Sequence, residues 1–408
     1  MIVQNIAYLY AIQLLRLMLP LALLSILTKV LTSTQYSVYI YTLGCAAWLS
    51  MLIEYGFNVS ATRRLASSSK PSEVLDIILQ TQSARLLLVA VSAIFLAWAI
   101  FSSSVFISYP EWALCAWFLG VMTGLTPTYY YQAMSKLKLV ALLEVIGGIL
   151  SVFSVVFIIR SSEDFWWLGV VLVVIRLIIW RVLERQMYKI HFLHWGKLFR
   201  LQLGFHALKD GWKFFLVQIA ASLYTSFNII LLGSTSSAYS VAIYGSSERL
   251  IRAGITFIGQ ATSAIFPKLN TLKSVDPMQL LRARRLTLII FILGGFFCLP
   301  FIWILAPLIS SILFHGILPE ITSVLRVMAW VVPAIAISNV LAIHFLVVDY
   351  KEQLVNRVVF TAVPISLMMG YVLSREYGAM GMTVAWVAIE WLVVIGLAVT
   401  LYINHKRT

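Results

Sequence analysis

Long apolar runs recur from one end of this chain to the other, and no other feature constrains its fold as strongly. Hydrophobic residues make up 61% of the 408 residues and charged residues only 11%, whereas a soluble domain carries roughly 25% charged residues. Too little polar surface remains to cover a water-soluble fold. Because about 20 apolar residues cross a bilayer as a helix, the pattern predicts an all-α integral membrane protein.

The apolar runs fit about twelve transmembrane helices joined by short loops. The first run is too long for a cleaved signal peptide and has no basic segment before it, so we interpret it as the first helix. The predicted spans lie near residues 8–31, 36–57, 82–106, 112–133, 138–159, 165–183, 213–234, 238–266, 286–314, 323–348, 357–374 and 381–403.

The net charge of +14 is distributed unevenly across these loops. One side holds most of the 30 Lys and Arg residues, Arg85 among them, whereas the other side holds Lys29, Arg160, Arg326 and Arg375. Basic loops remain in the cytoplasm, so both termini are predicted to be cytoplasmic. The charge therefore indicates membrane topology and contact with anionic membrane lipids, not a nucleic acid partner.

The two halves of the chain resemble each other. The segment Tyr36–Tyr41 (YSVYIY) opens the second predicted span, and Tyr239–Tyr244 (YSVAIY) opens the eighth. We predict an N-terminal lobe of six helices at residues 1–190 and a C-terminal lobe of six helices at 213–408. Six spans return the chain to its starting side, so the lobes should be related by a pseudo-two-fold axis along the membrane normal.

A polar linker at residues 191–212 separates the predicted lobes. It contains His191, His194 and His206, which could suggest a metal site. Aromatic residues separate these histidines, and the composition favours a cytoplasmic amphipathic helix at the membrane interface.

Several charged residues fall inside the predicted spans, where an ionised side chain costs roughly 2.5–3.5 kcal/mol. Arg249 and Arg252 are three residues apart and share one helix face, and Glu248 can neutralise only one of them. One interpretation is an anion-binding cavity, because arginine suits phosphate. The other is a structural cluster in which Glu390 or Glu54 supplies the missing negative charge.

Three further charged residues lie within spans of the N-terminal half. Arg16 either extends to the membrane surface or contributes a cation to the same cavity. Arg176 is expected to extend to the surface or pair locally, and Glu144 to provide polarity near the surface.

The sequence shows no catalytic motif, and we expect neither an enzyme, a cofactor nor a metal. It contains no Gly-rich phosphate loop, no Gly-x-Ser-x-Gly and no His-Glu-x-x-His. Cys45, Cys115 and Cys298 lie in apolar stretches without metal-ligand spacing.

Three segments resemble a known family. Glu54–Ala66 (EYGFNVSATRRLA) resembles the second-helix signature of Wzx-type flippases, which belong to the multidrug/oligosaccharidyl-lipid/polysaccharide exporter superfamily. Gly211–Asn228 is similar to the opening of their seventh helix, and Ser247–Ala253 (SERLIRA) to part of the eighth. The likeness covers most of the chain in layout and is weak in the last hundred residues.

The resemblance implies an exporter in the bacterial inner membrane. Such a protein moves an undecaprenyl-diphosphate-linked oligosaccharide repeat unit from the cytoplasmic to the periplasmic leaflet, by alternating access through a cationic cavity. A polysaccharide polymerase and a chain-length regulator are implied as partners. The residues assigned to substrate binding are Arg16, Asn58, Arg63, Asn228, Arg249 and Arg252. Those assigned to possible ion coupling are Glu54, Glu248 and Glu390.

Two alternatives remain open from the sequence. A multidrug antiporter of the same superfamily would need an acidic cavity for cationic substrates, which Arg249 and Arg252 disfavour. A membrane-embedded glycosyltransferase or polymerase would need a long external loop with paired carboxylates, and the predicted loops are short.

Overall fold

The computed structural model describes residues 2–68, 70–191, 200–315 and 319–407, which form helices joined by turns without a β-strand. The predicted all-helical class is therefore confirmed. The chain divides into two compact units, Met1–Ser222 and Leu223–Thr408. This boundary lies within α10, whereas the sequence places the start of the second lobe at residue 213.

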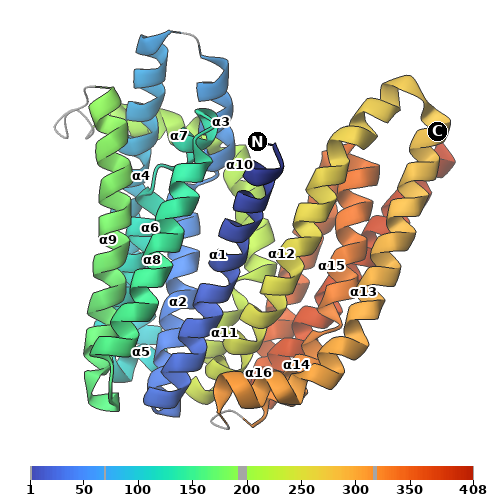
Figure 1. Ribbon diagram of the computed structural model, residues 1–408. Coiled ribbons are helices and arrows are strands. Elements are labelled where there is room, and N and C mark those ends of the chain that lie inside the picture. The colour runs from blue at the N-terminus through green and yellow to red at the C-terminus, as the bar shows by residue number, and fades with distance from the viewer. Residues whose placement is uncertain (1, 69, 192–199, 316–318, 408) are drawn as a thin grey trace. The chain divides into compact units, whose positions relative to one another are not determined.

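The first unit contains α1 to α9 and most of α10 (Figure 1). Its core is the bundle in which α2 packs against α6, α6 against α9, and α8 against both α1 and α9. The helices are α1 (Ile2–Val30), α2 (Ser33–Glu54), α3 (Phe57–Ser67), α4 (Pro71–Ser102), α5 (Ser104–Ser108), α6 (Pro110–Leu125), α7 (Thr128–Ala133), α8 (Leu137–Ile158), α9 (Phe165–Ile190) and α10 (Leu201–Thr225).

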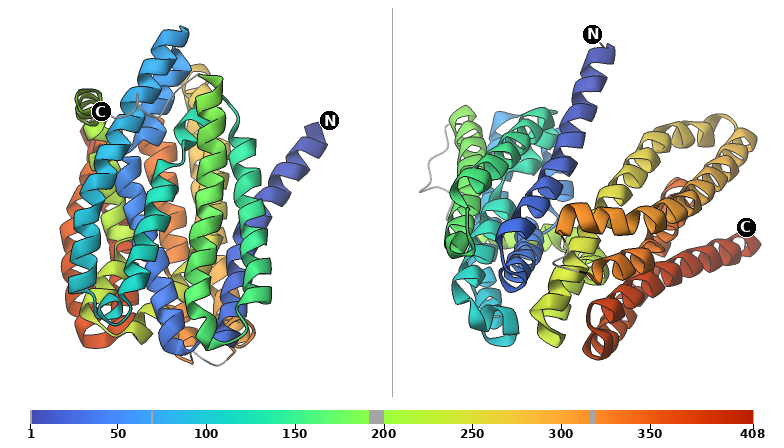
Figure 2. Two further views of the ribbon diagram at one scale, coloured as in Figure 1. Left: turned by 90° about the vertical axis from the view of Figure 1, so that its left-hand side faces the viewer. Right: turned by 60° about the horizontal axis from the view of Figure 1, so that its bottom comes forward.

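The second unit is dominated by two long helices that form a hairpin, α12 and α13, visible from two directions in Figures 1 and 2. Both pack against α14 and α15, and α15 packs on α16. The elements are α11 (Asn228–Thr235), α12 (Ala238–Val275), α13 (Pro277–Phe314), α14 (Ile321–Met328), α15 (Val331–Asn339), the π-helix η3 (Val340–Val347) and α16 (Glu352–Arg407).

Local sequence signals explain where these helices begin. The Thr32 side chain accepts a hydrogen bond from the Gln35 backbone at 3.3 Å and forms a capping box at the start of α2. Asp276 accepts from the Gln279 backbone at 2.9 Å, and Pro277 occupies the first turn of α13. Proline there needs no backbone donor, so the pair Asp276–Pro277 ends α12 and starts α13 within one turn.

The structure supports a multi-pass membrane protein. Among the described residues, seven helical stretches are long and apolar enough to cross a membrane, and the α10–α11 pair, bent by 50°, would make an eighth. One of these stretches, Glu352–Asn404, contains a break at Gly378 (φ 56°, ψ −130°), so it can hold two spans. The number twelve, the cytoplasmic termini and the pseudo-two-fold axis stay predictions.

The predicted linker at residues 191–212 is described only in part. Residues 192–199, and with them His194, lie outside the described residues. Residues 201–212 form the first turns of α10, which continues to Thr225. His191 lies at the end of α9, where its Nε2 is 3.1 Å from the Tyr130 hydroxyl, and His206 pairs with Asp210 at 3.2 Å.

Candidate functional site

In the second unit, Arg252 of α12 lies at the break between α10 and α11. Its Nη2 donates a hydrogen bond to the Thr225 carbonyl at 2.6 Å. Thr225 ends α10, and the last carbonyls of a helix have no partner within it. Arg252 therefore satisfies one carbonyl that the bend leaves open.

A carboxylate and an indole ring complete the surroundings of Arg252. Its Nε donates to the Glu248 carboxylate at 2.8 Å, one helical turn away, and its guanidinium lies 5.2 Å from the centre of the Trp386 ring. The Trp386 indole donates to Glu390 at 3.1 Å. Glu248 and Glu390 are both buried, so one ring separates Arg252 from a second buried carboxylate.

This arrangement bears on whether Arg249 and Arg252 belong to an anion-binding cavity or to a structural cluster. Arg252 has its ion pair with Glu248, and Glu390 faces it across Trp386 without a direct ion pair among the described residues. Arg249 lies half-buried one turn before Arg252, close enough to Glu248 to interact electrostatically. With Glu390 ionised, the four groups sum to no net charge. With Glu390 protonated, one positive charge remains.

A polar pocket of about 600 Å³ opens beside Arg252. Thr256, Gln260 and Ser263 continue the same face of α12 along it, and Asn339 of α15 closes one side. The Arg252 side chain is 37% exposed, so the guanidinium that holds the helix break also faces the pocket. A cation with hydroxyl and amide groups around it suits an anionic, hydrogen-bonding ligand.

Asn228, which the sequence assigns to substrate binding, is buried at the start of α11. Its amide nitrogen donates to the Tyr244 hydroxyl at 3.0 Å and to the Thr225 carbonyl at 3.4 Å. Both bonds hold the helix break, so Asn228 positions the segment that Arg252 contacts.

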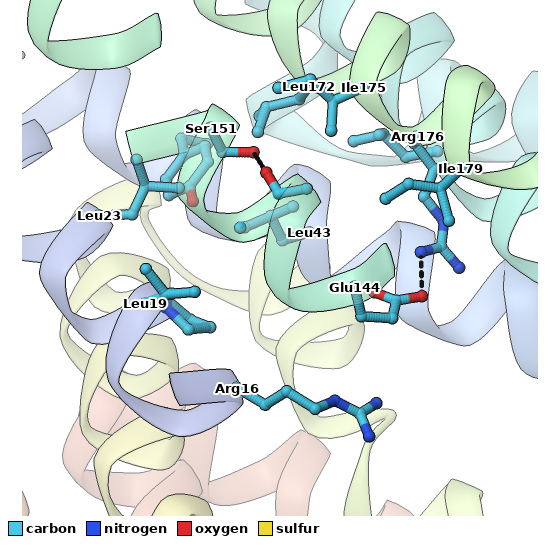
Figure 3. A pocket seen from close by; sticks show the side chains of 15 residues that line it. Arg16, Leu19, Leu23, Leu43, Glu144, Ser151, Leu172, Ile175, Arg176 and Ile179 are labelled. Carbon is cyan, nitrogen blue, oxygen red and sulfur yellow. Dashed lines mark hydrogen bonds and ion pairs between the residues drawn. The ribbon is translucent and has the colours of Figure 1, made fainter. Parts of the chain in front are cut away.

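The first unit has a pocket of about 400 Å³ that contains Arg16. Figure 3 shows Arg176 of α9 pointing to Glu144 of α8, with an ion pair of 2.6 Å, while Arg16 extends from α1 below them. The local pairing expected for Arg176 is confirmed. Two guanidiniums face one carboxylate here, and Arg16 is exposed, so this pocket also has an excess of positive charge.

Glu54, Asn58 and Arg63 follow one another across the break between α2 and α3. The Asn58 amide donates to Glu54 at 3.1 Å. Gly56 has a positive φ of 74°, and a Cβ on it would lie 3.0 Å from the Cβ of Phe214. Arg63 is exposed and lines a small pocket of about 150 Å³ between α3 and α10. The structure thus places Glu54 and Asn58 together and Arg63 apart from them.

Arg85 of α4 is a charged residue whose role sequence reasoning missed. It is fully buried, although it is predicted to be one of the basic residues of the cytoplasmic loops. Its Nη1 donates to the carbonyls of Leu125 and Thr126, at 3.4 and 3.1 Å, where α6 ends. The guanidinium lies 4.6 Å from the Tyr129 ring. Its position inside the predicted span 82–106 was the available signal.

The described part of the chain holds no group of three or more His, Cys, Asp or Glu side chains that could bind a metal ion. Cys45 and Cys115 are buried and Cys298 is exposed, each as a free thiol.

Comparisons with known proteins agree with the resemblance seen in the sequence. The profile of a family described as "Polysaccharide biosynthesis protein" matches residues 2–273. A protein of Shigella dysenteriae named "Putative O-antigen transporter" is 23% identical over 397 residues, covering 96% of this chain and 98% of the relative. A protein of the same name from Escherichia coli K12 is 23% identical over 405 residues, covering 96% and 94%.

Two solved structures share the fold. The lipid II flippase MurJ, in an inward closed conformation, has a TM-score of 0.77 at 14% identity and covers 98% of this chain and 88% of its own. An inward-facing multidrug resistance transporter of the MATE family has a TM-score of 0.67 at 13% identity, covering 97% and 98%. These likenesses describe the fold alone.

Proposed function

This chain belongs to the polysaccharide biosynthesis protein family, and from that premise we propose that it is a flippase for an undecaprenyl-diphosphate-linked oligosaccharide repeat unit. The unit would move from the cytoplasmic to the periplasmic leaflet of a bacterial inner membrane by alternating access, through two lobes of six spans each. Relatives named as O-antigen transporters support this substrate class.

The observation that carries the proposal is the polar pocket beside Arg252. A diphosphate cannot cross about 30 Å of hydrocarbon unaided. In this pocket a guanidinium within the predicted transmembrane span 238–266 faces a space of about 600 Å³ that is lined mostly by polar residues, with Arg249 one turn away. Arg252 is therefore our first candidate for binding the diphosphate, with Arg249 beside it and Arg16 as a further cation in the first unit.

We propose that Glu390 links substrate binding to a proton. The cluster of Arg249, Arg252, Glu248 and Glu390 carries a net positive charge only while Glu390 is protonated. Proton uptake would then favour binding of the anion, and proton loss would favour its release. Glu248 is tied to Arg252 directly, so Glu390 is the better candidate of the two. Glu54 remains a third candidate in the first unit.

The fold also fits a multidrug antiporter, but the pocket disfavours that alternative. Glu248 and Glu390 are buried with exposed fractions of 3% and 2%, and the described residues that line the pocket beside Arg252 include no carboxylate. A cationic drug would meet a guanidinium there. Efflux of ethidium from cells expressing the protein would favour this alternative over ours.

The proposal is tested by expressing the protein or its variants in a strain that lacks the gene and measuring the surface polysaccharide. Arg252→Ala alone leaves Glu248 buried without its partner, which can destabilise the fold. The sharper variant is Glu248→Gln with Arg252→Gln, because it removes both charges and keeps groups able to hydrogen-bond. We expect normal abundance by immunoblot and no surface glycan on a gel. Arg252→Lys should restore glycan in part, since a lysine lacks the planar fork.

Arg375→Ala is the matched control, because Arg375 is exposed near the break in α16. It should leave both glycan and abundance unchanged. Full-length surface glycan from an abundant double-glutamine variant would disprove the role of Arg252. If that variant alone disappears from the membrane, the arginine is structural.

A further inference from the structure

An apolar groove of about 560 Å³ lies on α12 and α13 in the second unit. Leu250, Gly254 and Phe257 of α12 form one wall, and Phe297, Cys298 and Phe301 of α13 form the other. No charged side chain is among its lining residues. Its volume is within the range of ligand pockets, roughly 300–1,000 Å³.

The groove is hollow because its wall lacks a side chain where the two helices diverge. A Cβ added at Gly254 would meet no atom within 4 Å. Opposite, the rings of Phe297 and Phe301 lie 4.8 Å apart and both are largely exposed. The groove is therefore an open, apolar surface with room for an apolar chain.

The groove and the polar pocket lie at the same level of α12. With about 3.6 residues per turn, Arg249 and Arg252 are on one face of the helix, and Leu250 and Gly254 are on the opposite face. Ala253 lies between the two faces. The small side chain of Ala253 therefore separates the cations from the groove on that side of the helix.

We propose that this groove binds the isoprenoid chain of the lipid-linked substrate while its diphosphate is held at Arg252, a statement that rests on the proposed function. The head group would pass on one side of α12 and the chain around Ala253 to the other side. The groove then defines where the apolar part of the substrate remains during transport.

The neighbouring cation favours this occupant over an ordinary phospholipid. The head group of a phospholipid stays at the membrane surface, so its acyl chain could enter the groove without any contact to Arg252 that would fix it there. A substrate drawn to Arg252 has its head group at the level of the groove, so its isoprenoid chain begins beside this apolar surface. A surface adjoining the cation at that level is what such a lipid requires.

Photo-crosslinking tests the proposal on the full-length protein in nanodiscs of phosphatidylethanolamine and phosphatidylglycerol. One probe is undecaprenyl diphosphate with a diazirine in its isoprenoid chain, and the other is phosphatidylglycerol with a diazirine in an acyl chain. We expect the isoprenoid probe to label peptides containing residues 250–258 and 297–302. An excess of unlabelled undecaprenyl diphosphate should remove this label, whereas added phosphatidylglycerol should not.

Three glycine variants form a matched set, because a Cβ at Gly254, Gly259 or Gly294 meets no atom within 4 Å. Gly254→Leu fills the groove and should lower isoprenoid labelling about tenfold, equivalent to roughly 1.4 kcal/mol. Gly294→Leu lies on α13 outside both pockets and should label like the wild type. Gly259→Leu occupies the polar pocket and should weaken binding of the head group.

The outcomes distinguish failure of the isoprenoid groove from failure of the proposed flippase function. Competable binding with labels elsewhere in the protein would overturn the groove and leave the proposed function intact. Equal labelling of the groove by the phospholipid probe, without displacement by undecaprenyl diphosphate, would also overturn it. Absence of any competable binding would contradict both hypotheses. The crosslinks of the wild-type protein test whether the isoprenoid chain binds in the groove, even if Gly254→Leu does not accumulate.

Discussion

Arg85 and Arg252 each donate hydrogen bonds to carbonyl groups at a helix break, one in each unit, but the two side chains differ in exposure. Each comes from a long helix and donates to carbonyl groups at the break of a neighbouring helix, Leu125 and Thr126 in the first unit and Thr225 in the second. Arg85 is fully buried over Tyr129. Arg252 is 37% exposed toward a pocket.

The difference teaches that an arginine within a predicted transmembrane span is not by itself a binding residue. Arg85 has no exposed surface with which to contact a ligand, and its Nε and Nη2 lack a hydrogen-bond partner among the described atoms. Arg252 can hold a helix break and a ligand together, because its ion pair with Glu248 uses only part of its donors. Exposure to the pocket is what distinguishes them.

The largest effect is expected at Arg85. Arg85→Ala removes a fully buried side chain and leaves the Leu125 and Thr126 carbonyls without their donor. We expect a loss of roughly 3–5 kcal/mol of unfolding free energy, measured as thermal unfolding in detergent and as abundance in the membrane. Arg85→Met should recover part of the packing and none of the hydrogen bonding. Normal abundance of the alanine variant would mean that Arg85 does not hold the break.

A second effect concerns Glu390, which faces Arg252 across Trp386. Glu390→Gln can still accept the indole hydrogen bond, so the protein should remain folded. It fixes the cluster in its positive state, and we expect undecaprenyl diphosphate to bind at least as tightly while transport is lost. Binding of undecaprenyl diphosphate to the purified variant checks the predicted affinity. Surface glycan in cells checks the predicted loss of transport. Full transport by this variant would exclude a proton role for Glu390.

Arg16 extends the comparison to the pocket of the first unit. Arg16→Ala removes an exposed cation that is not needed for the Arg176–Glu144 ion pair, so stability should change by less than about 0.5 kcal/mol. Loss of one charge-assisted hydrogen bond to the substrate should lower transport about tenfold. Unchanged surface glycan would indicate that Arg16 extends only to water and lipid.

The smallest effect is expected in the short 3-10 turn before α9 (Ser162–Asp164), ahead of the predicted span 165–183. Backbone N–H groups of Arg160 and Ser161 donate to Asp164 and lower the pKa of its carboxyl. A lowered folded pKa stabilises the loop above the ordinary aspartate pKa, and this stabilisation is lost as the pH falls through the folded value. Asp164→Asn should remove that pH dependence from thermal unfolding without affecting transport; equal pH profiles would contradict the assignment.

Composition and apolar periodicity were sufficient to predict the helical membrane fold, because the bilayer permits few alternatives. The pairing of Arg252 with Glu248 was also predictable, since the two residues are four apart on one helix. The roles of Arg85, Trp386 and Asn228 were not. Each depends on which neighbouring helix breaks and which carbonyl it exposes, and those contacts join residues far apart in the chain.

Reconstitution tests the central claim most directly. Proteoliposomes containing the full-length protein and a labelled undecaprenyl-diphosphate-linked sugar would be given a membrane potential, and appearance of the sugar on the opposite side would be measured. Each negative charge gains about 2.3 kcal/mol per 100 mV when it moves toward the positive side. We predict protein-dependent movement that this potential accelerates and that Glu248→Gln with Arg252→Gln abolishes. Movement as fast with the double variant as with the wild type would contradict the account.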